Sequence, residues 1–538
     1  MRMTMVRGRR VRATVGWEQM QGAPREVVMT TLRKDDRMSP RRGVDEVAPY
    51  AEVRETHSAV VFLVGDRAFK MKKPVDLGFL DFSSPTKRLR ACQSELVLNR
   101  RLAPDVYLGI SDLNDVDGKP LEHLLVMRRM PAGRRLAHLV ATHTWSDDGL
   151  TDLARIVADF HARASRSPEI DSCGARDAVA DRWETNFTEA RTSVGTSLDA
   201  DAYAEVCDLA RRYLAGRHDL FADRVGRGAV VDGHGDLLAE DIFMLPDGPR
   251  ILDCLDFDDR LRYLDRIDDV ACLVMDLERL GSAAAGQQFL DAYLQASGDD
   301  PPASLVHHYI AYRAFMRAKV ACLPGATGHG GYLASTLLDL ARRHLDDARV
   351  RMVLVGGSPG TGKTTVSAAL AEALDADVLS SDVVRKELAG VGADTAMPAP
   401  YREGIYTPEW TARTYDELLA RTERSVRLGR SVVLDASWGD VRRRAEVARL
   451  AEHTVSDLSQ FRCEVPDLVA DERLARRHSA SDADPHIAAE MRARFEDWPE
   501  AVAIDTGACV DVARAQILHR LQPWRTAPRV PRPRMLPD

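Results

Sequence analysis

A glycine-rich run at residues 357–364, Gly-Ser-Pro-Gly-Thr-Gly-Lys-Thr, contains the residue types that bind a phosphate chain. Glycines permit the tight loop whose backbone N–H groups surround a phosphate. Lys363 adds a positive charge for the β- and γ-oxygens, and the Thr364 hydroxyl can bind magnesium. An apolar stretch precedes the run and an amphipathic helix pattern follows it, which is the context that such a loop requires. We therefore predict that ATP binds to Gly357, Ser358, Pro359, Gly360, Thr361, Gly362, Lys363, Thr364 and Thr365.

Two acidic residues follow the next apolar segments of this region. Asp382 comes after residues 377–380, and Asp435 ends the run at 431–435. Ligands of open parallel sheets bind beyond the carboxyl ends of the strands, so both carboxylates are predicted to face the same crevice as Lys363. We interpret Asp435 as a magnesium ligand and Asp382 as the group that orients or deprotonates an acceptor hydroxyl. A helix N-cap is the alternative role for Asp382.

Arginines complete this predicted phosphoryl-transfer site. Arg385 follows Asp382 by one helical turn and would hold the acceptor. A later cluster suits a lid that neutralises the transferring phosphoryl group, although a solvated helix face is the alternative. The cluster consists of Arg473, Arg476 and Arg477.

A second set of residues, in the N-terminal half, indicates another nucleotide site. Residues 59–73 have the pattern of a hairpin whose second strand contains Ala68 and Lys70. These two side chains share one face of the strand, which leaves room for adenine and supplies a cation for phosphate. Lys72 shares that face and is the alternative lysine. Glu95, on the next helical segment, can pair with Lys70.

The motif His234-Gly235-Asp236, followed by Asp253 at the end of an apolar run, extends this set. Together with Lys70 and Glu95 it resembles the aminoglycoside phosphotransferase and choline kinase branch of the protein-kinase-like fold, over residues 50–323. The resemblance implies that Asp236 is the catalytic carboxylate and that Asp253 is a metal ligand.

The residue five after Asp236 is Asp241, where kinases of this fold normally have the asparagine that binds magnesium. Asp and Asn have nearly the same shape, and magnesium prefers hard oxygen ligands. We therefore predict that Asp241 binds magnesium and that the site is active. The added negative charge is expected to raise the pKa of one carboxylate there.

The C-terminal region, about 350–521, resembles the small P-loop kinases of the gluconate kinase, adenylate kinase and zeta-toxin type. The resemblance rests on GSPGTGKT, SDVVRKEL, VVLDAS and the arginine cluster. It implies the type of reaction and leaves the acceptor open. The tandem arrangement also resembles a class of bacterial two-domain proteins.

Composition limits the possible partners and the compartment. The net charge of −8 gives no reason to expect nucleic acid or an anionic membrane as a partner. The eight cysteines are scattered without metal-binding spacing, which is typical of free thiols in a reducing cytoplasm. No apolar run approaches the ~18 residues of a membrane span. We expect a cytoplasmic protein, and the sequence does not indicate its oligomeric state.

We predict an α+β bilobal protein-kinase-like domain followed by an α/β P-loop domain with a mostly parallel sheet. The predicted order is a disordered basic segment at 1–45, the kinase-like domain at 46–325, a linker helix at 326–350, the P-loop kinase domain at 351–522 and a Pro/Arg-rich tail at 523–538. The predicted function is a bifunctional phosphotransferase that uses ATP and Mg²⁺ on hydroxyl groups of small molecules such as sugars or amino sugars. Alternatively, one half is a nucleotide-binding regulatory module that controls the other.

Overall fold

The computed structural model describes residues 50–56, 58–76, 81–323, 330–392, 403–476 and 485–521, together with three short strands nearer the N-terminus. The chain divides into two compact units. Unit 1 contains residues 1–174 and 228–300, and unit 2 contains residues 175–227 and 301–538.

Unit 1 contains an eight-stranded sheet with the order β1-β2-β3-β7-β8-β6-β5-β4. Neighbouring strands are antiparallel, and Lys70 on β6 lies opposite Val61 on β5 and Leu125 on β8. One face of the sheet is covered by a core that includes Ala68 and Tyr107. The strands are β1 (Arg2–Val6), β2 (Arg10–Thr14), β3 (Val27–Met29), β4 (Ala51–Glu55), β5 (Ala59–Val64), β6 (Arg67–Lys72), β7 (Tyr107–Asn114) and β8 (Pro120–Arg128).

Helix α1 (Pro85–Asn99) packs against β7 and β8. It begins where sequence rules expect, because the Ser84 hydroxyl accepts a hydrogen bond from the Lys87 N–H and Pro85 occupies the first turn. Glu95 is buried on this helix. The helix therefore places the Glu95 carboxylate against the sheet that carries Lys70.

The rest of unit 1 is mainly helical, with α3 packed on α9 and α9 on α8. Its helices are η1 (Ala132–Arg134), α2 (Leu136–Ala141), α3 (Asp147–Arg163), α4 (Pro168–Cys173), η3 (Ala239–Asp241), η4 (Asp259–Leu261), α8 (Arg266–Arg279) and α9 (Ala283–Ser297). Two small antiparallel sheets accompany them. Their strands are β9 (Val230–Asp232), β10 (Ile242–Leu245), β11 (Gly248–Ile251) and β12 (Tyr263–Asp265).

Unit 2 begins with helices that pack around Trp183, which is buried against Phe187, Tyr312 and Phe315. These helices are α5 (Arg176–Ala190), η2 (Arg191–Ser193), α6 (Ala200–Ala215), α7 (His218–Gly226), α10 (Ala303–Ala321) and α11 (Gly330–Asp347). Helix α11 falls within the predicted linker helix.

The remainder of unit 2 is a five-stranded sheet with the order β14-β15-β13-β16-β17, and every pairing is parallel. The predicted α/β fold with a parallel sheet is thereby confirmed. β13 is buried along its whole length, as expected of a central strand covered on both faces. The strands are β13 (Arg351–Gly356), β14 (Asp377–Ser380), β15 (Val432–Asp435), β16 (Asp457–Glu464) and β17 (Val502–Asp505).

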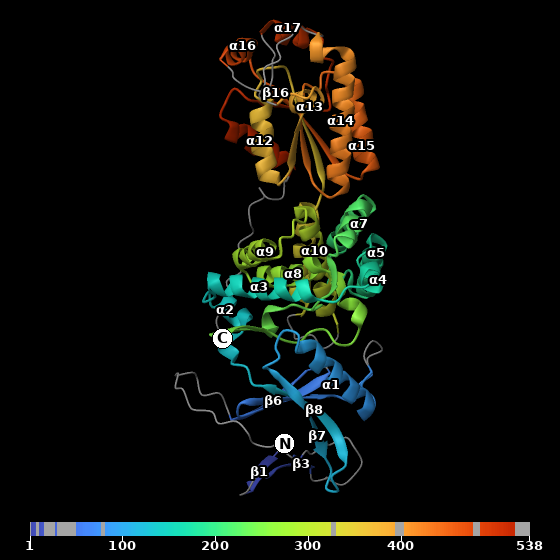
Figure 1. Cartoon of the computed structure of the whole chain (residues 1–538), viewed down its shortest axis with the longest axis vertical. Coiled ribbons are helices and arrows are strands. Elements are labelled where there is room, and N and C mark those ends of the chain that lie inside the picture. The colour runs from blue at the N-terminus through green and yellow to red at the C-terminus, as the bar shows by residue number, and fades with distance from the viewer. Residues whose placement is uncertain are drawn as a thin grey trace. The chain divides into compact units, whose positions relative to one another are not determined.

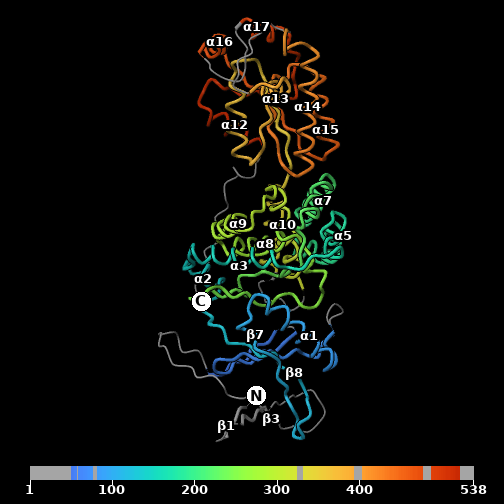
Figure 2. The backbone as a smooth tube through the Cα atoms, viewed as in Figure 1, coloured from blue at the N-terminus to red at the C-terminus, as the bar shows by residue number. Residues whose placement is uncertain are grey.

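Helices lie on both sides of this sheet, with α12 on one side and α14 and α15 on the other (Figures 1 and 2). Val366 and Leu370 of α12 pack against Val353 and Val355 of β13 to form the core of one layer. The helices are α12 (Lys363–Leu374), α13 (Ser381–Leu388), η5 (Gly404–Tyr406), α14 (Pro408–Arg427), α15 (Val441–His453), α16 (Asp467–Ala475), α17 (Pro485–Ala493) and α18 (Val510–Leu521).

Two features differ from the sequence predictions. Strands β1 (Arg2–Val6), β2 (Arg10–Thr14) and β3 (Val27–Met29) are assigned within residues 1–45, where we predicted disorder. Valines in these strands favour extended structure, and the disorder of the rest of this segment stays a prediction. The compact units also differ from the predicted domains, since α5–α7 and α10 group with the parallel sheet. The tail at 523–538 lies outside the described residues.

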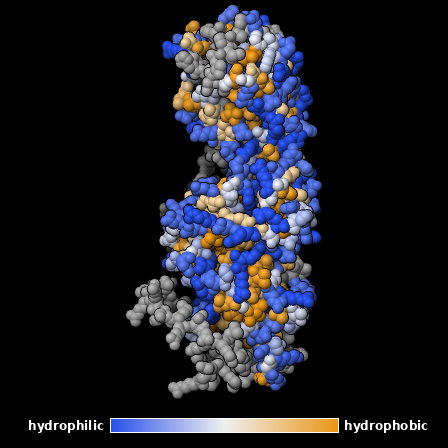
Figure 3. All heavy atoms as spheres, viewed as in Figure 1, coloured by the Kyte–Doolittle hydropathy of each residue, from blue (hydrophilic) through white to orange (hydrophobic). Residues whose placement is uncertain are grey.

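Hydrophilic side chains cover most of the face seen in Figure 3. Large exposed apolar side chains, such as Val97 and Leu468, are scattered over several elements. None of the described helices combines the length and the apolar character needed to cross a membrane.

Candidate active sites

The glycine-rich loop of unit 2 joins the end of β13 to the start of α12. Gly357, Gly360 and Gly362 have φ values of +131°, +83° and +85°, a region that side chains rarely tolerate. A Cβ atom at Gly360 would lie 2.5 Å from the carbonyl oxygen of Ala470, and one at Gly357 would lie 2.6 Å from that of Cys463. The backbone therefore comes as close to its surroundings as only glycine allows.

Lys363 is the first residue of α12, so its backbone is at the positive end of the helix dipole. Its Nζ donates a hydrogen bond of 2.9 Å to the carbonyl oxygen of Ser358 across the loop. Thr361 Oγ1 donates to the same carbonyl at 2.8 Å, and Thr506 Oγ1 donates to the carbonyl of Thr361. The loop is thus already closed around the lysine side chain.

Thr364 and Asp435 bring two oxygen atoms together beside this loop. Thr364 Oγ1 donates to Asp435 Oδ2 over 2.8 Å, and Asp435 is the last residue of β15 and is buried. Adjacent oxygen ligands of octahedral magnesium, each ~2.1 Å from the ion, lie about 3.0 Å apart. The spacing and the hard-oxygen chemistry of this pair therefore fit magnesium.

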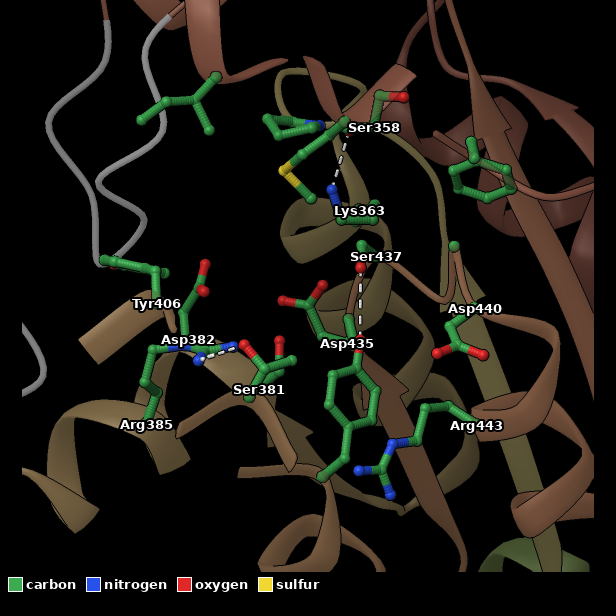
Figure 4. Close-up of a pocket in the computed structure, with 18 of the residues that line it drawn as sticks. Ser358, Lys363, Ser381, Asp382, Arg385, Tyr406, Asp435, Ser437, Asp440 and Arg443 are labelled. Atoms are coloured by element: carbon green, nitrogen blue, oxygen red, sulfur yellow. Dashed lines mark hydrogen bonds between the residues drawn. The ribbon is translucent and has the colours of Figure 1, made fainter. Parts of the chain in front are cut away.

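A pocket of about 980 Å³ opens next to the loop and is lined by Lys363, Thr364, Asp382 and Asp435. Figure 4 shows Asp382 and Asp435 directed into the cavity below Lys363. The predicted meeting of these residues at the carboxyl ends of β13, β14 and β15 is therefore observed. Asp382 is not the N-cap of α13, because Ser380 occupies that position.

The predicted arginines lie around the same pocket. Arg385 is buried, its Nη1 donates to the carbonyl of Ile405 at 3.0 Å, and its guanidinium lies 5.0 Å from the centre of the Tyr406 ring. Arg473 and Arg476 line the pocket from α16 and its C-terminal end. Arg473 Nη2 donates to the carbonyl of Thr506 at 2.9 Å. The predicted Arg477 lies outside the described residues.

Sequence reasoning missed part of the pocket wall. Tyr415 of α14 lines the pocket, and burial raises the pKa of its phenol. Its hydroxyl lies 3.3 Å from Ser437 Oγ, and Arg443 lies over its ring at 5.5 Å. Ser437 follows the carboxyl end of β15 and could have been predicted from that place. Nothing in the sequence distinguishes Tyr415 from an ordinary core residue.

In unit 1, Lys70 contacts Glu95, its predicted partner, and also Asp253, which was predicted as a metal ligand. Its Nζ lies 2.8 Å from Glu95 Oε1 and 2.8 Å from Asp253 Oδ1. Burial works to lower the pKa of Lys70, but the charges of Asp253 and Glu95 outweigh it and hold the pKa well above its ordinary value. The lysine is therefore charged and is shared between two carboxylates.

Lys72, the alternative lysine, also binds Glu95. Its Nζ lies 2.7 Å from Glu95 Oε2 and 2.9 Å from Asp256 Oδ2. Each oxygen of Glu95 therefore contacts a different lysine. The charges form a chain in the order Asp253, Lys70, Glu95, Lys72 and Asp256.

The loop that carries Asp236 is held by a buried carboxylate. Asp269 accepts hydrogen bonds from the backbone N–H of His234 at 2.6 Å and of Gly235 at 2.9 Å. Gly235 has a φ of +87°, which its lack of a side chain permits. Asp276 accepts from the Ala239 N–H at 3.0 Å, further along the same loop. Helix α8, which carries both acids, thus determines the shape of the loop.

The segments that carry Asp241 and Asp253 lie side by side, and their carboxyl groups interact. The backbone N–H of Leu252 donates to the carbonyl of Asp241 at 3.0 Å, and the Asp253 N–H donates to the Tyr107 hydroxyl at 3.1 Å. Burial, and then the charges of Asp253 and Asp236, raise the pKa of Asp241 well above its ordinary value. This is the direction that the extra charge predicted.

The donor set of this site suits a hard cation. Within the described ranges no group of three or more His, Cys, Asp or Glu side chains is close enough to hold a metal ion. Magnesium is commonly held by one or two carboxylates together with substrate phosphates. Asp241 and Asp253, whose mutual repulsion a cation would relieve, fit that mode.

A glycine loop with Lys363 and Thr364, placed between a buried parallel strand and a helix, defines a P-loop nucleotide-binding domain. Residues 352–498 match a family model described as an AAA domain. The chain is 44% identical over 482 residues to the uncharacterized protein Rv2004c of Mycobacterium tuberculosis, which covers 89% of this chain and 96% of that protein. The uncharacterized protein Mb2027c of Mycobacterium bovis is similar to the same extent. The chain therefore belongs to the family of these mycobacterial proteins.

Two of the similar solved structures each cover part of this chain. A choline/ethanolamine kinase family protein from Mesorhizobium loti is 16% identical with a TM-score of 0.36, covering 56% of this chain and 88% of that chain. A gluconokinase from Sinorhizobium meliloti is 20% identical with a TM-score of 0.23, covering 32% of this chain and 91% of that chain.

Proposed function

We propose that the chain is a bifunctional phosphotransferase, with one ATP- and magnesium-dependent site in each unit. Both sites act on hydroxyl groups of small molecules such as sugars or amino sugars. The family match supports nucleotide binding in unit 2. The arrangement of charged side chains in each unit supports phosphoryl transfer at both sites. A cytoplasmic location, and the absence of nucleic acid as a partner, stay predictions from composition.

In unit 2 the acceptor oxygen attacks the γ-phosphorus of ATP. A new oxygen–phosphorus bond forms as the bond between that phosphorus and the bridging oxygen breaks, and ADP leaves. Asp382 takes the proton of the acceptor hydroxyl, and Lys363 balances charge on the phosphate oxygens. Magnesium, when bound, neutralises phosphate charge and would be held by Thr364 and Asp435.

The arginines divide between the two substrates. Arg385 contacts the acceptor, because it lines the pocket one helical turn from Asp382 and has no carboxylate partner among the described residues. Arg473 and Arg476, on the side of the glycine loop, neutralise the phosphoryl group during transfer. The Arg473 guanidinium supports this role, since its Nη1 would lie 3.5 Å from a Cβ atom at Gly362.

The observation that carries the proposal is the 2.8 Å contact between Thr364 and Asp435, next to Lys363 and in the same pocket as Asp382. A purely structural nucleotide site would need no carboxylate beside the position of the γ-phosphate. The pocket also has room for more than a nucleotide phosphate chain, since small-molecule sites commonly occupy ~300–1,000 Å³.

In unit 1, Lys70 binds the phosphates, Glu95 orients Lys70, and Asp236 takes the acceptor proton. Asp241 and Asp253 would hold magnesium there. The support is the pair of 2.8 Å contacts that join Lys70 to Glu95 and to Asp253.

The test is release of ADP by the full chain with a panel of sugars, amino sugars and nucleosides. Lys363→Ala and Asp236→Ala are each expected to abolish one set of substrates and to spare the other. An exposed lysine, Lys87→Met, serves as the matched control. If either variant abolishes every activity, the halves are coupled and the regulatory alternative holds. ADP release that neither variant reduces would refute the proposal.

A further inference from the structure

Glu95 in unit 1 contacts two lysines, and each of these lysines also contacts a second carboxylate. Its side chain is 1% exposed, and its two oxygens contact the Nζ atoms of Lys70 at 2.8 Å and of Lys72 at 2.7 Å. Lys70 is shared between Glu95 and Asp253, so it does not neutralise Glu95 alone. Lys72 supplies the remaining positive charge.

The two lysines differ in what surrounds them. The Lys70 side chain is 18% exposed, so a phosphate can reach it. The Lys72 side chain is 6% exposed, and its Nζ lies 5.0 Å from the centre of the Phe82 ring and 2.9 Å from Asp256 Oδ2. Lys72 is thus enclosed by partners inside the protein, which argues against direct contact with a nucleotide.

Nucleotide binding changes the charge balance at Lys70. Before binding, Lys70 is shared between Glu95 and Asp253. A phosphate chain adds further negative charge to the same ammonium group, so less of its charge neutralises Glu95. A buried carboxylate that is poorly neutralised is unstable and moves toward water. Such a movement would release Lys70 from its position.

We propose that Lys72, held by Asp256, is a positioning residue that keeps Glu95 neutralised and in place while Lys70 binds the phosphates. The inference rests on the proposed nucleotide site of unit 1. It assigns different roles to two lysines of one strand, with Lys70 at the phosphates and Lys72 behind Glu95. Burial works to lower the pKa of Lys72, but Glu95 and Asp256 hold it above its ordinary value, so the lysine stays charged.

The experiment uses the full chain with Lys363→Ala as the parent, so that nucleotide binding reports on unit 1. Calorimetry measures the Kd of magnesium–ADP. Lys72→Met is expected to weaken binding about tenfold to hundredfold, the range typical of residues that support a binding group. Lys72→Arg keeps the charge and is expected to lose less binding than Lys72→Met, because its larger guanidinium still neutralises Glu95. Lys87→Met, on the same helix as Glu95, is the control and is expected to bind like the parent.

A double-mutant cycle separates positioning from direct contact. If Lys72 acts through Glu95, then Lys72→Met has little further effect in a Glu95→Gln background, because the carboxylate that it supports is already gone. A direct contact between Lys72 and the nucleotide would give the same loss in both backgrounds and would overturn the inference. Equal losses in Lys72→Met and Lys72→Arg would also overturn it, since packing and not charge would then be responsible.

Folding of the variants is checked by thermal melting. If Lys72→Met does not fold, Asp256→Asn replaces it, since the Asp256 side chain is 15% exposed and is easier to substitute. Asp256→Asn is expected to weaken binding several-fold, and binding equal to the parent would refute the role of Lys72. A parent that binds no nucleotide would refute the proposed function of unit 1 itself, which is a distinguishable result.

Discussion

Replacing Asp269 with alanine is expected to loosen the loop that carries Asp236. The carboxylate is completely buried and accepts three hydrogen bonds, from the His234 and Gly235 N–H groups and from Nε2 of His161 at 3.1 Å. An ionised carboxylate can only accept, so Nε2 of His161 carries the proton. Asp269→Ala leaves three buried donors without an acceptor.

The size of the effect follows from those donors. Each buried donor that loses its acceptor costs about 1–3 kcal/mol, which gives roughly 3–9 kcal/mol for three. Water entering the vacated space reduces this cost, so we expect a loss near the low end of that range, about 3 kcal/mol, from the unfolding free energy of unit 1. Domains of this size are stable by ~5–15 kcal/mol, so the variant would be severely weakened.

Calorimetric melting gives the stability, and hydrogen exchange of peptides covering residues 230–240 gives the local effect. Exchange in that segment is expected to rise more than in the parallel sheet of unit 2. Asp291→Ala, which removes an exposed carboxylate on α9, is the control and should change stability by less than ~0.5 kcal/mol. An Asp269→Ala protein within about 1 kcal/mol of the parent, with unchanged exchange at 230–240, would refute the reasoning.

Acid adds a second test of the same contacts. Burial works to raise the pKa of Asp269, but hydrogen bonds from His161 and His234 and the charges of those histidines outweigh it and hold the pKa well below its ordinary value. A depressed pKa contributes stability that is present above the unfolded value of about 3.9 and is lost as pH falls toward the folded value. The stability difference between the parent and Asp269→Asn should therefore be full at pH 7 and should shrink below about pH 4.

Three further predictions concern the two active sites. Gly360→Ala should weaken nucleotide binding in unit 2 at least about tenfold, because φ is +83° and the new Cβ would lie 2.5 Å from the Ala470 carbonyl; a titration that matches the parent contradicts this. Asp382→Asn should lower kcat of the unit 2 activity by about 10²–10⁴ while KM for ATP stays within about threefold, as measured by steady-state kinetics. Unchanged kcat would exclude Asp382 as the base. Asp241→Asn should leave the magnesium-dependent turnover of unit 1 within about tenfold of the parent, and complete loss would show that the second charge is required.

Local sequence patterns were sufficient for the phosphate loop and the carboxylates of unit 2. The phosphate loop needs positive φ values, which residues other than glycine avoid. Glycines at this spacing therefore predict the loop from the sequence alone. Asp435 and Asp382 follow apolar strands, and the carboxyl ends of parallel strands meet at one edge of the sheet. The direction of the pKa change at Asp241 was predicted from the neighbouring acids, but burial, which comes from the tertiary structure, is its larger cause.

Contacts between distant segments could be predicted only where a family resemblance supplied the pairing, as for Lys70 and Glu95. The sequence left Lys70 and Lys72 as alternatives, because strand alternation puts both on one face and does not say what approaches that face. Packing of α1 on the sheet put Glu95 within reach of both, and the loop after β11 brought Asp256 to Lys72. Tyr415 became a pocket residue only because α14 packs near the end of β15.

The amino-acid sequence alone was enough to place a phosphate-binding loop and the acids beside it, since these depend on backbone conformation and strand order within short segments. Only the tertiary structure decided which charged groups from distant segments contact each other. One example is the row of alternating charges from Asp253 to Asp256, and another is the hydrogen bonding of Asp269 to the loop that carries Asp236. The physical reason is that a buried charge is stable only beside its partner, and the partner's distance along the sequence has no bearing on its distance in space.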